Sequence, residues 1–129
     1  MFGTYQHSEL RIEVAASAAD ISASLTQLEP LQRWLWPQKI TSDDVTTGPL
    51  AVGQVLESSL GPVGTTHQVE LISPMGIRFL LSGSIDGFHE WQWGDGWMQS
   101  RLEGVSLLPL NLGQTLSLLR LKQHLASSI

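Results

Sequence analysis

Hydrophobic and polar residues alternate with a period of two through the stretch from residue 77 to residue 105. This period is typical of β-strands that bury one face, because successive side chains of a strand point to opposite sides. Turn sequences at Asp86-Gly87 and Asp95-Gly96 divide the stretch into three strands, which predicts an antiparallel meander. The residues expected on its inner face are Ile77, Phe79, Leu81, His89, Trp91, Trp93, Met98, Ser100 and Leu102.

Turn residues separate further alternating runs along the rest of the chain. Strands are predicted over about residues 4–15, 40–47, 53–60, 65–73, 77–84, 88–94 and 97–106. Two short helices are expected after the first strand. Ser17 begins the first helix in a capping box with Asp20, and Glu29-Pro30 ends it. The second helix is predicted from Leu31 to Trp36, stopped by Pro37.

The register of the last hairpin follows from its two-residue turn at Asp95-Gly96. This turn pairs Trp91 with Ser100 on the inner face. It also places Glu90 opposite Arg101 on the outer face, where opposite charges attract across the strands. The outer-face charge pair supports the predicted register.

The preceding hairpin is predicted to close through a three-residue loop over residues 85–87. This loop pairs Leu81 with Trp91 and Phe79 with Trp93. A two-residue turn would mix the faces, because a slip of one residue moves every side chain to the other side of the sheet. The same alternation adds His67, Val69 and Leu71 to the inner face.

A leucine-rich helix is predicted from Leu112 to Leu125, with Asn111 as its N-cap. Its leucines form two stripes on roughly opposite faces. The stripe expected to grip the sheet consists of Leu112, Leu116 and Leu119. The other consists of Leu118, Leu121 and Leu125. This second stripe either packs beneath the short helices or is exposed to a partner, a second copy of the chain or another protein.

Composition and charge exclude several classes of function. The chain has 129 residues, a size typical of a single domain over residues 1–129, and a net charge of −5 with no basic run. Nucleic acids and anionic membrane surfaces are therefore not expected partners. The absence of cysteine excludes disulfides and thiolate chemistry. No signal peptide and no apolar run of ~20 residues is visible, so we expect a cytoplasmic protein without membrane insertion.

Histidines are the candidate chemical groups on the inner face. A neutral imidazole at His67 or His89 has the chemistry of a general acid or base, and a buried histidine satisfied by a hydroxyl or a carbonyl is the simpler interpretation. His89-Glu90 lacks the second histidine of a zinc motif, so neither a metal nor a cofactor is expected. Trp91 and Trp93 can form an aromatic wall, beside which Gly83 leaves room for a ligand.

The chain resembles the START-like, or SRPBCC, helix-grip superfamily, in particular its polyketide cyclase/dehydrase-like branch. The resemblance rests on the order of elements and on weak motifs over nearly the whole chain. These motifs are residues 13–20, the segment 34–37, Val52-Gly53-Gln54, the run 87–91 and the terminal helix. It implies an α+β helix-grip fold, in which a curved seven-stranded antiparallel sheet wraps around a long C-terminal helix, with two short helices after the first strand.

The resemblance also implies a cavity between the sheet and the C-terminal helix for a small hydrophobic or aromatic ligand, a lipid or a polyketide-like metabolite. Two alternatives are a cyclase, aromatase or dehydratase that uses His67 or His89, and a non-catalytic protein-interaction module. An enzyme should place an inner-face histidine within hydrogen-bond reach of a second polar group, whereas an interaction module should have a filled core. The expected ligand-binding residues are Trp34, Trp36, His67, Phe79, Gly83, His89, Trp91, Trp93, Met98, Ser100, Leu112, Leu116 and Leu119.

Overall fold

A computed structural model describes residues 3–34, 39–42, 48–60 and 62–127 of the chain. The elements, in chain order, are β1 (Thr4–Glu13), α1 (Ala18–Thr26), α2 (Leu28–Trp34), β2 (Lys39–Ser42), β3 (Val55–Leu60), β4 (Val63–Ser73), β5 (Gly76–Gly83), β6 (Asp86–Gly94), β7 (Trp97–Ser106) and α3 (Leu110–Ser127). None of the helices in these ranges is long and apolar enough to cross a membrane.

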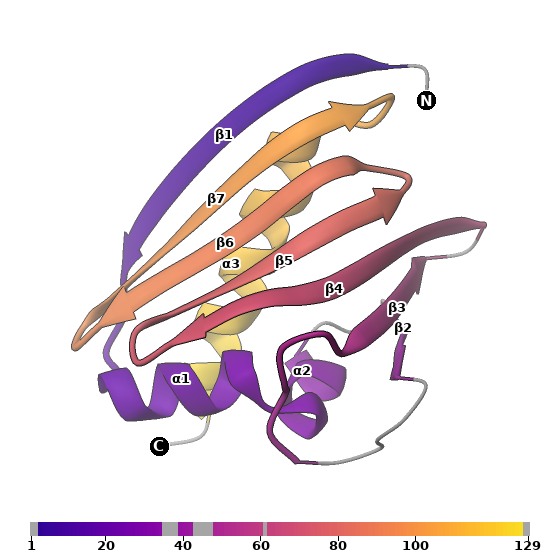
Figure 1. Ribbon diagram of the computed structural model, residues 1–129. Helices are drawn as coiled ribbons and strands as arrows, with labels where there is room; N and C mark the ends of the chain where they lie inside the picture. The colour runs from indigo at the N-terminus through magenta and orange to yellow at the C-terminus, as the bar shows by residue number, and fades with distance from the viewer. Residues whose placement is uncertain (1–2, 35–38, 43–47, 61, 128–129) are drawn as a thin grey trace.

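The strands form one antiparallel, seven-stranded sheet in the order β1-β7-β6-β5-β4-β3-β2. The sheet curves around α3, while α1 and α2 lie together near one end of it (Figure 1). Helix α3 contacts β1, β7, α1 and α2. The predicted α+β helix-grip fold is therefore confirmed.

The capping and proline signals in the sequence predicted the two short helices, whose observed ends differ from the predicted ones by a few residues. Ser17 caps α1, since its Oγ accepts from the Asp20 amide at 3.2 Å, while the carboxylate of Asp95 accepts from the Ala18 amide at 2.7 Å. Helix α1 ends at Gln27, and Pro30 lies in the first turn of α2, where its missing N–H is tolerated. Trp36 and Pro37, predicted to end the second helix, lie outside the described residues.

The hairpin between β6 and β7 has the predicted register, with Trp91 opposite Ser100 and Glu90 opposite Arg101. The hairpin between β5 and β6 does not. Phe79 pairs with His89 instead of Trp93, so the predicted register was wrong by four residues. An even shift keeps every side chain on its face, and the predicted inner face of these strands is therefore retained.

The sequence misplaced this turn because two glycines exchange roles. Gly83, and not Gly87 of the predicted loop, has a positive φ, of 91°. Gly87 lies inside β6 and pairs with Gly104 of β7, where a Cβ would collide with the backbone oxygen of Glu103. Asp86-Gly87 is thus the point where two strands approach each other closely. Such an approach and a tight turn both require glycine, so they have the same sequence signature. A separate bulge between Val69 and Leu71 turns Leu71 outward, against the prediction.

The two leucine stripes of α3 are exchanged relative to the prediction. Leu118, Leu121 and Leu125 are buried, so of the two alternatives for this stripe it packs in the interior and does not meet a partner. Leu112, Leu116 and Leu119, predicted to grip the sheet, are 69%, 48% and 58% exposed. The helix begins at Leu110, so Asn111 lies within it and is not the N-cap. Instead, the side-chain oxygen of Gln6 in β1 accepts from the Leu110 amide at 2.9 Å.

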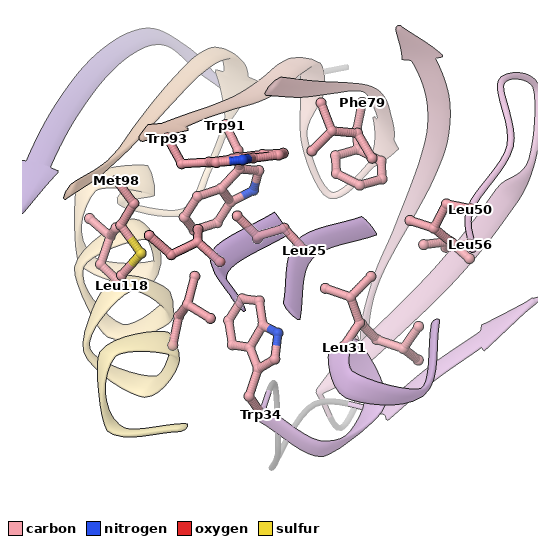
Figure 2. Close-up of a cluster of buried hydrophobic side chains, with 14 of the residues drawn as sticks. Leu25, Leu31, Trp34, Leu50, Leu56, Phe79, Trp91, Trp93, Met98 and Leu118 are labelled. Carbon is pink, nitrogen blue, oxygen red and sulfur yellow. The ribbon is translucent and has the colours of Figure 1, made fainter. Parts of the chain in front are cut away.

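The tightly filled part of the core lies where α1 and the second half of α3 cover the sheet. Trp93 and Met98 are buried here and belong to one apolar cluster with Leu25 and Leu118 (Figure 2). Trp34 approaches this cluster from α2. The apolar contacts of these side chains fix the sheet, α1 and α3 relative to one another.

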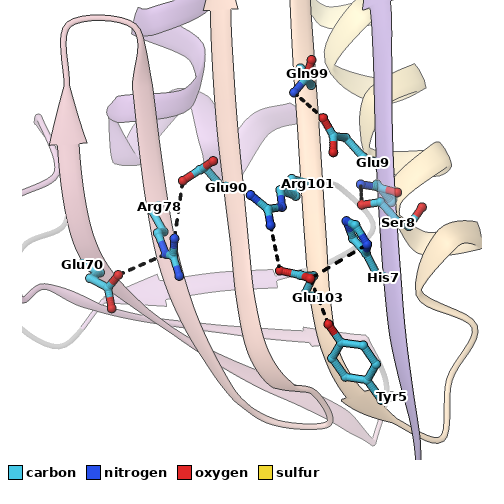
Figure 3. A network of polar contacts seen from close by, with 11 residues as sticks. Tyr5, His7, Ser8, Glu9, Glu70, Arg78, Glu90, Gln99, Arg101 and Glu103 are labelled. Carbon is cyan, nitrogen blue, oxygen red and sulfur yellow. Dashed lines mark hydrogen bonds and ion pairs between the residues drawn. The ribbon is translucent and has the colours of Figure 1, made fainter.

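A polar network covers the outer face of the sheet (Figure 3). Arg78 forms ion pairs with Glu70 at 3.0 Å and with Glu90 at 3.7 Å, while Arg101 pairs with Glu103 at 3.3 Å. Although Glu90 faces Arg101 across the strands, its ion pair is made with Arg78. Each such partly exposed pair contributes at most ~1 kcal/mol to the free energy of unfolding. The network is therefore not the main source of the stability of the sheet.

The close approach of β6 and β7 gives a first testable prediction. Gly87→Ala should lower the free energy of unfolding in urea by about 1–3 kcal/mol, because the added methyl group overpacks against the Glu103 backbone. Gly113→Ala is the matched control. A Cβ at this helical position meets nothing within 4 Å and should stabilise the protein by up to ~1 kcal/mol. Equal stability of the two variants would contradict the register of β6 against β7.

Candidate functional site

A cavity of about 260 Å³ lies between the first half of α3, the inner face of the sheet and α2. Its apolar wall includes Trp34, Leu56, Phe79, Leu81, Trp91 and Leu102. Its polar lining residues are Ser58, Ser59, Thr65, His67, Ser84, His89, Gln114 and Ser117. The volume lies just below the roughly 300–1,000 Å³ of typical ligand pockets, so the cavity suits a small molecule.

The cavity brings together five of the predicted ligand-binding residues: Trp34, His67, Phe79, His89 and Trp91. The rings pack edge to face, with centroids 6.2 Å apart for Trp34 and Trp91, and 6.1 Å apart for His67 and Phe79. The indole N–H of Trp34 donates to the Ser24 carbonyl at 2.9 Å, which fixes this ring from behind. The ligand-binding role of these residues remains a prediction.

The other predicted residues do not line the cavity. Trp93 and Met98 belong to the filled core described above. Gly83 is the last residue of β5 and does not line this cavity, and Trp36 lies outside the described residues. Leu112, Leu116 and Leu119 point away from the sheet. Ser100 is fully buried behind the wall and acts on the cavity only through its neighbours.

One hydrogen-bonded chain runs from the cavity into the sheet and α3. Nε2 of His89 lies 2.6 Å from Oγ of Ser100, and Nε2 of Gln114 donates to the same Oγ at 3.0 Å. The Gln114 amide also donates to the carbonyl oxygens of Ser100 at 2.8 Å and Ser8 at 3.1 Å. This chain connects α3 with three strands, β1, β6 and β7, at the cavity wall.

A second polar row lies on β3, β4 and the turn after β5. Nε2 of His67 is 2.8 Å from Oγ of Ser58, and the hydroxyls of Thr65 and Ser84 are 2.6 Å apart. Both histidines are therefore within hydrogen-bond reach of a second polar group, as expected of an acid–base site. In the ranges that the structure describes, no group of three or more His, Cys, Asp or Glu side chains is placed to hold a metal ion.

Burial keeps both imidazoles neutral. It lowers the pKa of His67 from 6.5 to about 4. The pKa of His89 falls to about 3, because burial and the nearby charge of a protonated His67 both disfavour its cationic form. At neutral pH the cavity wall therefore offers uncharged hydrogen-bonding groups.

Gln114 is the site residue that sequence analysis missed. It is absent from the predicted ligand-binding residues, yet it is 2% exposed and lines the cavity. A signal was present, because Gln114 lies at the helical spacing that joins Leu110 to Leu118, Leu121 and Leu125 on one face. A polar residue inside an otherwise apolar stripe is a marker of a buried hydrogen-bonding site.

No family model matches the sequence, and no curated protein matches it. Solved structures with the same fold include a protein from the dynemicin biosynthetic locus, DynU16, at 14% identity and a TM-score of 0.73. That match covers 95% of this chain and 48% of DynU16, so the chain spans about half the length of this neighbour.

Two further neighbours match over nearly their whole length. The Aha1 dimer from Colwellia psychrerythraea is 20% identical with a TM-score of 0.66, and the match covers 93% of this chain and 96% of that one. Protein CV1439 from Chromobacterium violaceum is 14% identical with a TM-score of 0.73, over 92% and 96% of the two chains. At these identities the likeness establishes the fold. Fold and site together define a helix-grip protein with a small, mostly apolar internal cavity.

The two buried histidines should make the stability of the fold depend on pH. Their folded-state pKa values lie below the 6.5 of an exposed histidine, so the unfolded chain binds more protons in acid. Their stabilising contribution is complete above about pH 6.5 and is lost as the pH falls toward 4 and 3. The free energy of unfolding in urea should fall by up to ~1.4 kcal/mol per pH unit for each ring in this window.

Two variants distinguish the effect of the histidines on stability from the destabilisation that low pH causes through other groups. His89→Gln removes one titrating ring while keeping a polar partner for Ser100, so the loss between pH 7 and pH 5 should become smaller. Ile77→Val should lower the stability at both pH values by the same amount, since it removes only a buried methylene from the core. A wild-type protein equally stable at pH 7 and pH 5 would show that the rings are not held neutral by burial.

Proposed function

We propose that this protein binds a small hydrophobic or aromatic molecule in the cavity between the sheet and α3. The observation that carries the proposal is the partly open cavity of about 260 Å³ with three aromatic rings, Trp34, Phe79 and Trp91, on its wall. A packed core would fill such a space, because voids larger than a water molecule are few in protein interiors. The small volume favours a compact aromatic metabolite over a long-chain lipid.

A place in the polyketide cyclase/dehydrase-like branch of the helix-grip proteins is part of this proposal. It is supported by the fold shared with DynU16, which comes from the locus of dynemicin biosynthesis. The aromatic rings of the wall also suit a flat, fused-ring metabolite of the polyketide kind. Such a ligand buries its faces against indole and phenyl rings, and its edge meets the polar row.

The protonation states of the histidines favour recognition over acid–base catalysis. A general acid or base works best when its pKa lies near the operating pH. With pKa values of about 4 and about 3, His67 and His89 are weak bases. At pH 7 almost none of either ring is in the imidazolium form that acts as a general acid. The enzyme alternative, a cyclase, aromatase or dehydratase using either ring, therefore ranks second to binding.

A matched pair of substitutions on β5 tests the binding proposal. Leu81 lines the cavity, while the neighbouring Leu80 points to the outer face and is 39% exposed. Leu81→Trp should weaken binding of the fluorescent probe N-phenyl-1-naphthylamine at least about tenfold, because the indole occupies the cavity. Leu80→Trp should leave the affinity within about twofold of wild type. Affinity is measured by titration with the naphthylamine emission as the signal. Wild-type protein that does not bind the probe, or equal affinities of both variants, would contradict the proposed site.

A second candidate function is self-association through the outer face of α3. Leu112, Leu116 and Leu119 are all exposed and lie at the helical spacing that places them on one face of α3. The chain has no charged residue between positions 107 and 119, so two copies can meet here without burying a charge. The structural neighbour Aha1 from Colwellia psychrerythraea is described as a dimer. We therefore propose that a second copy of this chain covers the leucine face.

The oligomeric state of charged variants tests this second candidate. The double variant Leu112→Glu/Leu119→Glu should be monomeric by sedimentation equilibrium at concentrations where the wild-type protein is a dimer, because each carboxylate would be buried in the interface. Leu80→Glu is the matched control, an exposed leucine on the sheet that should leave the dimer intact. A wild-type protein that sediments as a monomer at all concentrations would exclude this candidate.

A further inference from the structure

The orientation of the Gln114 amide is fixed by its surroundings. Its Nε2 lies 2.8 Å from the carbonyl oxygen of Ser100 and 3.1 Å from that of Ser8. A carbonyl oxygen only accepts hydrogen bonds, so the nitrogen end of the amide must face these two groups. The oxygen end, Oε1, is therefore turned away from them.

The Oε1 atom of Gln114 is buried and has no hydrogen-bond partner within the described part of the chain. The residue is 2% exposed, and its side chain belongs to the wall of the cavity. Buried amide oxygens are nearly always paired in folded proteins, and each exception calls for an explanation. A hydrogen-bond donor on a bound molecule would supply this missing partner.

The ring of His89 lies beside Gln114 on the same part of the wall. Ser100 is fully buried, and its Oγ accepts from Gln114 at 3.0 Å. Nε2 of His89 lies 2.6 Å from the same Oγ, and the tautomer of the ring decides which of these two atoms donates. His89 and Gln114 both contact this one Oγ, so a histidine ring and an unpaired acceptor lie side by side.

We infer that the ligand of this cavity is a compact aromatic molecule with a hydroxyl group, which donates to Oε1 of Gln114 and lies beside His89. The inference rests on the proposed binding function and names its ligand class. A hydroxyl both donates and accepts, so it complements the two wall groups together. A ketone or an ether only accepts, which leaves Oε1 without a partner. A carboxylate is disfavoured because none of the described residues that line the cavity is a lysine or an arginine.

Three probes with the same ring system test the inference on the wild-type protein: 2-naphthol, 2-methoxynaphthalene and naphthalene. The methyl ether keeps the oxygen acceptor and removes the donor, and naphthalene removes both while being smaller. We expect 2-naphthol to bind at least about tenfold more tightly than either of the others at pH 7, by calorimetric titration. Tight binding of naphthalene equal to that of 2-naphthol would show that size, not the donor, governs affinity, and would overturn the inference.

The variant Gln114→Met removes the amide and keeps the length of the side chain. In this variant the preference for 2-naphthol over naphthalene should shrink to within about twofold, while naphthalene still binds. If Gln114→Met still prefers 2-naphthol about tenfold, the naphthol hydroxyl must donate to a group other than Gln114. This result would overturn the inference. Leu80→Ala, on the outer face of β5 and outside the cavity lining, is the control and should keep the preference.

Gln114→Met also removes the bonds to Ser8 and Ser100, so a second pair of probes tests the same point without any substitution. Indole donates through its N–H, whereas 1-methylindole has the same rings and no donor. The wild-type protein should prefer indole at least about tenfold, and equal affinities would overturn the inference. The two proposals fail differently: binding of none of the five probes contradicts the proposed function, whereas binding without a donor preference contradicts the hydroxyl ligand alone.

Discussion

The amide of Gln114 sets the position of α3 on the sheet, and the layout of the interior depends on this contact. Its hydrogen bonds to Ser8 and Ser100 join the first half of the helix to β1 and β7. The Gln6 side chain adds another polar contact at the helix start. Beyond Gln114, leucines take over the buried face and pack on the sheet and α1. One half of the helix is thus held by directional bonds and the other by apolar packing.

This division explains why the interior is filled at one end and open at the other. Apolar side chains interdigitate until the space between helix and sheet is closed, as around Trp93 and Met98. A hydrogen bond instead has a set length, and it keeps the helix backbone at a distance from the sheet that small side chains do not fill. Gly113 and Ser117, which flank the amide on the cavity wall, are small. The cavity follows because the hydrogen bonds of Gln114 fix the distance between α3 and the sheet, and the small residues beside it do not fill the space.

The sequence was sufficient for the fold because strands are specified by alternation, which survives errors of register. The β5–β6 pairing was misjudged by four residues, yet Phe79 and Leu81 still lie on the inner face. The turn itself could not be placed, since Asp86-Gly87 fits a tight turn and a close approach of strands equally well. Only the packing of Gly87 against β7, a contact distant in sequence, decides between them.

The site was less predictable, because its key residue breaks the pattern used to find it. Leucines occur on both faces of α3, so counting apolar residues could not decide which face is buried. The stripe that contacts the sheet contains Gln114, and an uninterrupted set of leucines faces outward. The aromatic wall was easier to predict, since Trp91 and Phe79 are inner-face residues of well-patterned strands.

The electrostatic character of the cavity follows from its few polar groups, which are uncharged at neutral pH. Both histidines are held neutral by burial, and each uses one ring nitrogen on a serine hydroxyl. No formal charge is therefore provided by the described groups of the wall at neutral pH, and a charged ligand would enter without a counterion. Selectivity must come from shape and from the direction of hydrogen bonds. Because the Gln114 amide both positions α3 and carries the unpaired acceptor, a molecule that donates to it completes a contact on which the fold already depends.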